Sequence, residues 1–430
     1  MKKRLCGLAV LGAVLVANMA GLSGCSGGKT GHDSDSALAP EEETYRYLTD
    51  EEKESDSMEL QLAPTVKLDG TIMPRSEYEQ GLNLYYCKVQ EPLTVELTNE
   101  EWDSIILART DEIMSVIEAN SSVTFNREEQ QIYNDHDVSL PYATVTVPYT
   151  DADGEEQHLW VNFVLENDKT ARVYGLELGE GDNVDLADNI RRCTPDYSKD
   201  ALEFGSSITG ELAARTFIEE FTGFEFCETS VCVPVSYENI QEMKERHLGE
   251  ITVPYSQTEC YVYYFYWQID GFPSKRVQAY AKKSEVGELD SSIQGEENQI
   301  TLEGVSPLSV SCDATGIRSI HIPDLYLVSA ESSEIYKENM QMADINTILK
   351  RATDYFTEYY TEKVIEIKNV SICYGQKLTD EEDGPAKKIW YPYWTLDVSV
   401  KPKYTTTCDT YMMAFDGITG ELLEYINDLE

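Results

Sequence analysis

Residues 211–430 repeat one order of elements, and this repetition is the strongest constraint on the fold. Tyr-Trp-x-x-Asp and a closing turn of the form Asp-x-x-(x)-Gly stand at corresponding places in both halves, so duplication explains the pattern better than chance. In each copy a helix pattern is followed by three strand patterns. The first copy predicts elements at 212–222, 231–237, 260–269 and up to 313–317, and the second predicts them at 345–360, 364–374, 389–400 and up to 416–421.

An earlier segment has a similar order. Thr98 and Glu101 form a capping-box pattern before an apolar helical stripe that runs to residue 119. Alternating strand patterns follow at 142–149, 158–165 and 171–176. This segment is compatible with a third copy of the unit.

These patterns predict an α+β fold, built from tandem units of one helix packed on an antiparallel β-meander. The predicted domains are a signal peptide at 1–24, a disordered acidic tether at 25–62, an N-terminal α+β domain at 63–195, and two repeat units at 196–330 and 331–430.

The amino-terminal segment predicts export. Lys2, Lys3 and Arg4 precede an apolar run that ends at Ala20, and Leu-Ser-Gly-Cys25 follows. This box resembles that of bacterial lipoproteins, which implies that Cys25 carries a diacylglycerol and becomes the new N-terminus. We therefore expect an extracytoplasmic protein, lipid-anchored to the outer face of the bacterial cytoplasmic membrane. An ordinary signal peptide with an incidental Cys, or an uncleaved anchor helix, is the alternative.

Charge narrows the choice of partners. The chain carries a net charge of −44, and removal of the basic signal segment would lower it to −47. Such a surface repels phosphate backbones, so we expect no nucleic-acid partner. Cationic partners and divalent ions stay open, and solubility alone is the simplest reason for the charge.

Eight cysteines follow Cys25, an even number that is compatible with disulfides in an exported protein. They are Cys87, Cys193, Cys227, Cys232, Cys260, Cys312, Cys373 and Cys408. Cross-strand disulfides and buried thiols are both open, and the sequence does not fix a pairing. Metal binding is disfavoured because Cys-x-x-Cys is absent and the five histidines are scattered.

The two aromatic strands carry the candidate partner surface. If Trp267 is aligned with Trp394, one face of each strand covers the helix of its unit. The opposite face is aromatic in both copies, and it carries Tyr264, Tyr266, Asp270, Tyr391, Tyr393 and Asp397. This face is either a binding surface for a partner chain or peptide, or a packed face under a loop or between units.

The order of helix, hairpin, aromatic strand and closing turn resembles the PepSY module. Residues 416–421, Asp-Gly-Ile-Thr-Gly-Glu, match the closing motif of that family except that Gly417 replaces Ala, and residues 313–317 are one residue shorter. Tandem modules behind an exported anchor are similar to the YycH/YycI class of Gram-positive regulatory proteins. The resemblance covers about half the chain and implies an extracytoplasmic module that inhibits, senses or docks on an envelope protein.

Catalytic patterns are absent from the sequence. There is no Gly-x-Ser-x-Gly, no His-Glu-x-x-His and no Gly-rich phosphate loop. Residues 151–156 contain part of a calcium-loop pattern, but they lie between two strand patterns and favour a plain hairpin turn. We expect no enzyme activity, no cofactor and no metal.

The sequence therefore predicts a binding or regulatory lipoprotein that acts through contact with an envelope protein or peptide. The alternative is a lipoprotein that captures a small solute or glycan for transport. That alternative lacks the long alternating βα pattern that builds two hinged lobes around a solute.

Overall fold

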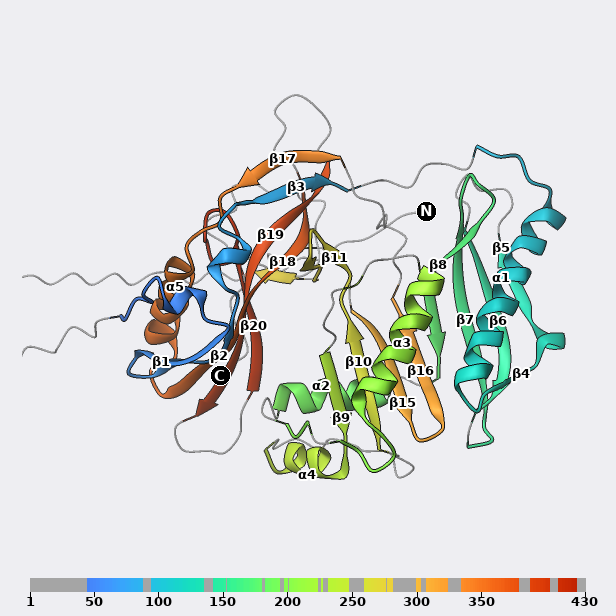
Figure 1. Cartoon of the computed structure of the whole chain (residues 1–430), viewed down its shortest axis with the longest axis horizontal. Coiled ribbons are helices and arrows are strands. Elements are labelled where there is room, and N and C mark those ends of the chain that lie inside the picture. The colour runs from blue at the N-terminus through green and yellow to red at the C-terminus, as the bar shows by residue number, and fades with distance from the viewer. Residues whose placement is uncertain are drawn as a thin grey trace, which may run out of the picture. The chain divides into compact units, whose positions relative to one another are not determined.

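We analysed a computed structural model of the chain, in which residues 43–430 form one compact unit (Figure 1). The structure describes residues 45–87, 94–134, 142–151, 153–179, 182–193, 197–199, 201–222, 226, 231–246, 259–275, 277–280, 299–302, 307–323, 334–378, 387–402 and 409–423. The predicted lipid site, Cys25, lies outside these residues. No helix among them is long and apolar enough to cross a membrane.

One sheet has nine strands among the described residues, and it consists of two meanders joined edge to edge. Along its main path the order is β4-β6-β7-β8-β16-β15-β10-β9, and β5 also pairs with β6. The strands are β4 (Thr124–Phe125), β5 (Gln131–Asn134), β6 (Tyr142–Thr150), β7 (Glu156–Leu165), β8 (Ala171–Leu178), β9 (Val231–Val235), β10 (Cys260–Phe265), β15 (Leu308–Asp313) and β16 (Gly316–Ile322).

Each half of this sheet is a four-stranded antiparallel meander, and one helix precedes each meander in the chain. Helix α1 (Asn99–Asn120) precedes β5-β6-β7-β8, and α3 (Ser207–Thr222) precedes β9-β10-β15-β16. The capping box predicted at Thr98 is present, with the Thr98 hydroxyl accepting from the backbone of Glu101. The N-terminal segment thus repeats the architecture of the first repeat unit.

The two halves share one sheet because β8 and β16 pair antiparallel, with Leu178 opposite Ile320. The predicted boundary between residues 195 and 196 therefore does not separate two independent domains. Helix α2 (Asp182–Cys193), which was assigned to the N-terminal domain, instead contacts β9 and β10 of the next unit together with α4 (Tyr237–Arg246).

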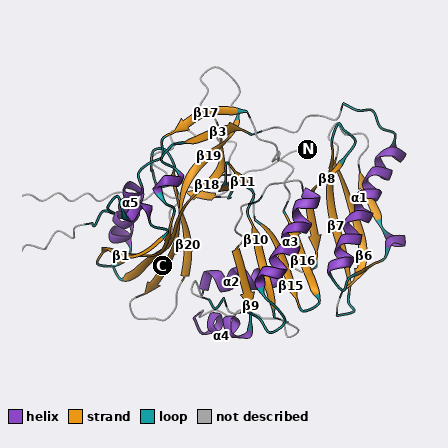
Figure 2. Ribbon diagram, in the orientation of Figure 1, coloured by secondary structure: helices purple, strands orange, loops and turns teal. Residues whose placement is uncertain are grey.

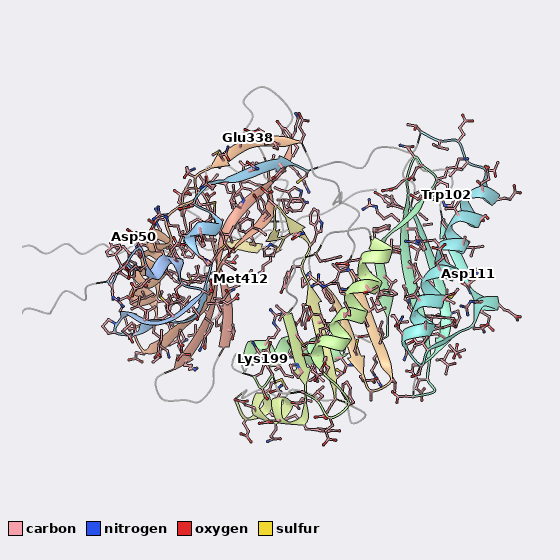
Figure 3. All side chains as sticks on the ribbon, in the orientation of Figure 1. Asp50, Trp102, Asp111, Lys199, Glu338 and Met412 are labelled. Atoms are coloured by element: carbon pink, nitrogen blue, oxygen red, sulfur yellow. The ribbon has the colours of Figure 1, made fainter. Side chains whose placement is uncertain are left out.

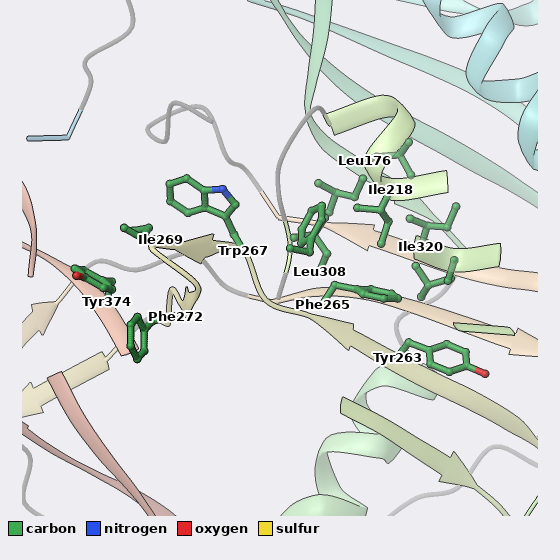
Figure 4. Packing of buried hydrophobic residues seen from close by; sticks show 14 of the residues in the cluster. Leu176, Ile218, Tyr263, Phe265, Trp267, Ile269, Phe272, Leu308, Ile320 and Tyr374 are labelled. Carbon is green, nitrogen blue, oxygen red and sulfur yellow. The ribbon is translucent and has the colours of Figure 1, made fainter. Parts of the chain in front are cut away.

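Strand β10 is buried on both faces, as its apolar and aromatic residues require. Tyr261, Tyr263 and Phe265 belong to the core cluster that contains Phe217 and Ile218 of α3. Figure 4 shows Tyr263 and Phe265 on one strand, with Ile218 and Ile320 nearby. The alternate residues Cys260, Val262 and Tyr264 belong to a separate cluster with residues of α2 and α4.

The second large sheet has seven strands among the described residues. They are β1 (Ser57–Ala63), β2 (Val66–Ile72), β3 (Leu82–Tyr86), β17 (Ile335–Met340), β18 (Lys363–Leu378), β19 (Lys388–Pro402) and β20 (Asp409–Asp416). Helix α5 (Ile345–Tyr359) buries Ile345, Ile348 and Phe356 in the core formed with this sheet. In Figure 2, α1 and α3 lie over strands of the first large sheet. The predicted α+β class is confirmed.

The predicted tether is too long at its carboxyl end. Residues 45–62 of the predicted tether belong to the described fold. Strand β1 pairs with β2, which in turn pairs parallel with β18. Met58, Leu60 and Leu62 alternate along β1, and Leu60 and Leu62 are buried in the core with α5. The first strands of the chain therefore complete the sheet of the last repeat unit.

The closing Asp residues behave as the turn pattern predicts. Asp313 accepts hydrogen bonds from the backbone and hydroxyl of Thr315, and Asp416 accepts from the backbone N–H groups of Ile418 and Thr419. Gly420 has a φ of +69° and lies against α5, with Ile348 3.3 Å from where a Cβ would stand. The turn thus packs the end of β20 against the helix.

The alignment of the two aromatic strands is wrong by six residues. In the first unit, Cys312 directly precedes the closing Asp313 and pairs with Tyr261. In the second unit, Phe415 directly precedes the closing Asp416 and pairs with Trp394. The strand pairing therefore makes Tyr261 the counterpart of Trp394. Six is an even number, so the predicted faces survive the shift.

Trp267 lies beyond the end of β10, where the chain forms a short separate hairpin. It consists of β11 (Gln268–Ile269) and β12 (Phe272–Pro273), and Asp270 in its turn has a φ of +55°. Trp267 packs edge-on against Trp390, with ring centroids 5.2 Å apart. The remaining described elements are β13 (Val277–Tyr280), β14 (Gln299–Leu302), η1 (Glu52–Glu54), η2 (Arg75–Glu77) and η3 (Arg127–Glu129).

Candidate functional site

The predicted tyrosine surface is not an exposed surface. Tyr264, Tyr391 and Tyr393 are 2%, 7% and 1% exposed. Helix α2 covers Tyr264, whose hydroxyl donates to the carbonyl of Val184, and burial raises the pKa of this tyrosine well above its ordinary value. The packed alternative therefore holds for these three residues, and the prediction of a partner surface is corrected.

Tyr391 and the three remaining members of that set also have internal partners. Tyr391 donates to the buried carboxylate of Asp416 at 2.8 Å, and Asp397 accepts from Asn369 at 3.0 Å. Asp270 is exposed but accepts from the hydroxyl of Tyr85 at 2.6 Å. Tyr266 is half-buried, with the Lys275 ammonium 5.4 Å from its ring centroid.

A different site lies along α5, where the helix meets the segment that leads into β1. We call it the α5 groove. It comprises two cavities that share Asp354 in their walls. Its residues are Tyr45, Tyr47, Lys53 and Ala63 from the first described segment, and Asp344, Asn346, Thr347, Lys350, Arg351, Thr353, Asp354, Thr357 and Glu358 from α5 and its cap.

Two contacts fix the wall of this groove to the first turn of α5. The Asn346 side chain accepts from the backbone N–H of Leu48 at 2.7 Å and donates to the Leu48 carbonyl at 3.1 Å. Asp344 caps the helix through the N–H of Asn346, and its other oxygen binds the Lys53 ammonium at 2.7 Å. Lys53 is 8% exposed, whereas the Asp344 side chain is 48% exposed, so only the lysine side of this ion pair is withdrawn from water.

The larger cavity, of about 520 Å³, lies beside the first half of α5. Three cations line it, Lys53, Lys350 and Arg351, with two carboxylates, Asp344 and Asp354. Asp344 pairs with Lys53 and Asp354 pairs with Lys350, so Arg351 is the one cation of this lining without an ion pair among the described residues. Figure 3 labels Asp50, which belongs to the wall segment, at the surface near α5.

The smaller cavity, of about 280 Å³, lies beside the second half of α5. Tyr45 and Thr353 contribute to its wall, and Thr353 is 3% exposed. Both hydroxyl oxygens are buried, and neither has a hydrogen-bond partner among the described residues. A buried hydroxyl without a partner costs about 1–3 kcal/mol, so a polar occupant here would be stabilised.

Two opposite charges along the groove have no ion pair among the described residues. The Arg351 guanidinium donates to the carbonyl of Thr419 at 3.2 Å, and Glu358 lines the smaller cavity at an exposed position. By contrast, Lys350 is paired with Asp354 at 2.5 Å. Arg351 and Glu358 are seven residues apart, which places them on one stripe of α5, about 10.5 Å apart along its axis.

Sequence reasoning missed the α5 groove because its two walls lie almost 300 residues apart in the chain. A local signal for one wall was present, since Met58, Leu60 and Leu62 alternate as a strand does. No local signal pairs that strand with α5. The surrounding Asp and Glu residues favoured a tether instead.

The described cysteines and carboxylates do not suggest redox or metal chemistry. Cys232, Cys260, Cys312 and Cys373 are free, and burial raises the pKa of Cys232, Cys260 and Cys312 to about 12. Within the described part of the chain, no group of three or more His, Cys, Asp or Glu residues is arranged to hold a metal ion.

Comparison with known proteins adds one structural similarity. No known family and no curated protein matches the chain. Among solved structures, an uncharacterized protein from Eubacterium rectale ATCC 33656 matches 86% of this chain and 94% of its own, with 14% sequence identity and a TM-score of 0.48. This chain is thus similar to a protein that itself has no assigned function.

Proposed function

We propose that this chain is an extracytoplasmic binding or regulatory lipoprotein that acts by contact with a protein or peptide and carries out no catalysis. The α5 groove is the proposed contact site. Its two cavities, its aromatic and charged walls and its buried hydroxyls without partners are the features that a polar ligand site combines.

The observation that carries this proposal is the pair of enclosed hydroxyls of Tyr45 and Thr353 beside a cavity. A wall with no ligand role would gain stability by pairing these groups or by replacing them with apolar atoms of the same shape. Their position next to an open space supports recognition of a ligand that supplies hydrogen bonds.

Site-specific photocrosslinking in living cells tests the proposal. Tyr47 is 55% exposed at the groove, so a photoreactive amino acid there should capture a discrete polypeptide or peptide. Tyr237, 67% exposed on α4, is the matched control and should not capture it. The same products at both positions, or none at Tyr47, would count against the groove as the contact site.

The location is proposed from the amino-terminal sequence and has its own test. Cys25→Ser should abolish metabolic labelling with a fatty acid and move the protein from the membrane fraction to the soluble fraction. Cys6 lies within the apolar run, so the control variant Cys6→Ser should change neither the labelling nor the fractionation. Retention of Cys25→Ser in the membrane would favour an uncleaved anchor.

A further inference from the structure

The two uncompensated charges of the α5 groove lie at opposite ends of one stripe. Arg351 is at the end with the larger cavity, and Glu358 is at the end with the smaller cavity. A ligand that lies along this stripe meets a cation at one end and an anion at the other. The groove is therefore complementary to a dipolar ligand.

The backbone of α5 adds to this polarity. Its amino end carries partial positive charge and its carboxyl end carries partial negative charge. Arg351 lies nearer the amino end and Glu358 lies one residue before Tyr359, the last residue of α5. In the last turn, Glu358 and the helix both favour a cationic group, whereas Arg351 is the seventh residue of α5, beyond the first turn, so its side chain alone favours an anionic group there.

The length of the stripe limits the ligand. Seven residues of helix span about 10.5 Å. An extended chain spans about 3.3–3.6 Å per residue, so three residues cover the same distance. The hydroxyls of Tyr45 and Thr353 lie at the wall beside Glu358, where a peptide N–H or C=O group could pair with them after a small shift of the Tyr45 ring.

We propose that the α5 groove binds a short peptide with free termini, about three residues long, whose carboxylate pairs with Arg351 and whose ammonium group pairs with Glu358. This inference rests on the proposed function and specifies its ligand class. A guanidinium binds a carboxylate through two parallel hydrogen bonds, which suits recognition of a chain end.

Thermal unfolding of the full-length protein in mild detergent tests this inference. The probe is a pool of tripeptides randomised at every position, used with free termini, with acetylated amino ends, or with amidated carboxyl ends. The free pool should raise the unfolding midpoint by at least about 3 °C, since a ligand in excess stabilises the folded state. Each capped pool should lose most of this increase.

Variants then assign each end of the peptide. Arg351→Gln should bind the free and the amidated pools equally, and Glu358→Gln should bind the free and the acetylated pools equally. A loss of about tenfold in affinity for the free pool, measured by calorimetry, is expected for each variant. Glu362→Gln, an exposed carboxylate outside both cavities, is the matched control and should behave as the wild type.

The outcomes separate this inference from the proposed function. Binding of all three pools with equal affinity would overturn the recognition of free termini but would leave peptide contact at the groove intact. Absence of binding by every pool, together with a discrete crosslink from Tyr47, would overturn the short-peptide ligand and favour a folded protein partner. Failure of both experiments would remove the proposed function as well.

Discussion

At the scale of single residues, Asp416 offers a direct test of the closing turn. Its carboxylate is 5% exposed and accepts from the backbone of Thr419, from Tyr391 and from Lys377 at 3.1 Å. Burial alone would raise the pKa of Asp416, but these donors outweigh it and hold the pKa below its ordinary value. Asp416→Asn should therefore lower the free energy of unfolding by about 2 kcal/mol at neutral pH.

The effect of this variant should depend on pH. A carboxyl group with a lowered pKa in the folded state stabilises the protein above its unfolded pKa, and this contribution disappears as the pH falls through the folded pKa. The difference between wild type and Asp416→Asn, measured by urea unfolding, should shrink from pH 6 towards pH 3. Asp168→Asn is the matched control, because Asp168 makes a similar turn with Thr170 at an exposed position. It should cost no more than about 0.5 kcal/mol.

Three thiols of the nine-stranded sheet, buried at Cys260 and Cys312 and half-buried at Cys232, give a second prediction at this scale. Cys232, Cys260 and Cys312 are free, and burial raises the pKa of each to about 12. Because the thiolate is the reactive form, these cysteines should resist maleimide labelling at pH 7.5 in the folded protein and react after denaturation. Mass spectrometry of labelled peptides measures this. Rapid labelling of Cys260 in the native protein would contradict its burial.

At the scale of elements, Gly70 should be needed where β2 meets β18. The register of β18 shifts between Ile367 and Asn369, and a Cβ on Gly70 would stand 1.9 Å from the carbonyl oxygen of Lys368. Gly70→Ala should therefore destabilise the protein by about 2 kcal/mol or more in urea unfolding. Gly205→Ala is the control, since a Cβ there meets nothing within 4 Å. Equal midpoints for the two variants would show that the strands adjust freely.

Individual elements also show what the sequence could predict. The bounds expected for α5 differ from the observed ones by a single residue, because its apolar positions recur at helical spacing and Asp344 caps its start. Within β10 and β19 the two faces were predicted correctly even though the alignment was not, because strand faces depend only on odd and even positions. The prediction was wrong for Tyr266 and Asp270, which lie beyond the end of β10. What covers each face, such as α2 over Tyr264, depends on contacts between distant segments.

At the scale of the whole molecule, the candidate site could not be predicted for the same reason. Hydrophobic periodicity and turn chemistry are signals over a few residues. The α5 groove instead brings together Tyr45 and Thr353, which are far apart in the sequence. The pairing of β8 with β16 is likewise invisible to local patterns, so two predicted domains proved to share a sheet. Local sequence patterns therefore predict each helix-and-meander unit well, but they predict poorly how the units pair with one another.

Truncation tests how far the first folded segment belongs to the last unit. A chain that begins at residue 64 lacks Leu48, Leu60 and Leu62, each at most 7% exposed. Each buried leucine contributes about 1.5–3 kcal/mol, so the loss approaches the whole stability of a typical domain. Hydrogen exchange should show lost protection in β2 and β18, whereas a chain that begins at residue 45 should keep it. Unchanged protection in both chains would contradict this role of β1.

The parallel pairing of β2 with β18 has a consequence for biosynthesis. Residues 66–72 leave the ribosome long before residues 365–370, with which they pair. A product that stops early therefore has an unfinished sheet and apolar strand residues with nothing to cover them. We therefore expect proteases to degrade such fragments faster than the full chain, because only a chain that includes β18 can complete this sheet.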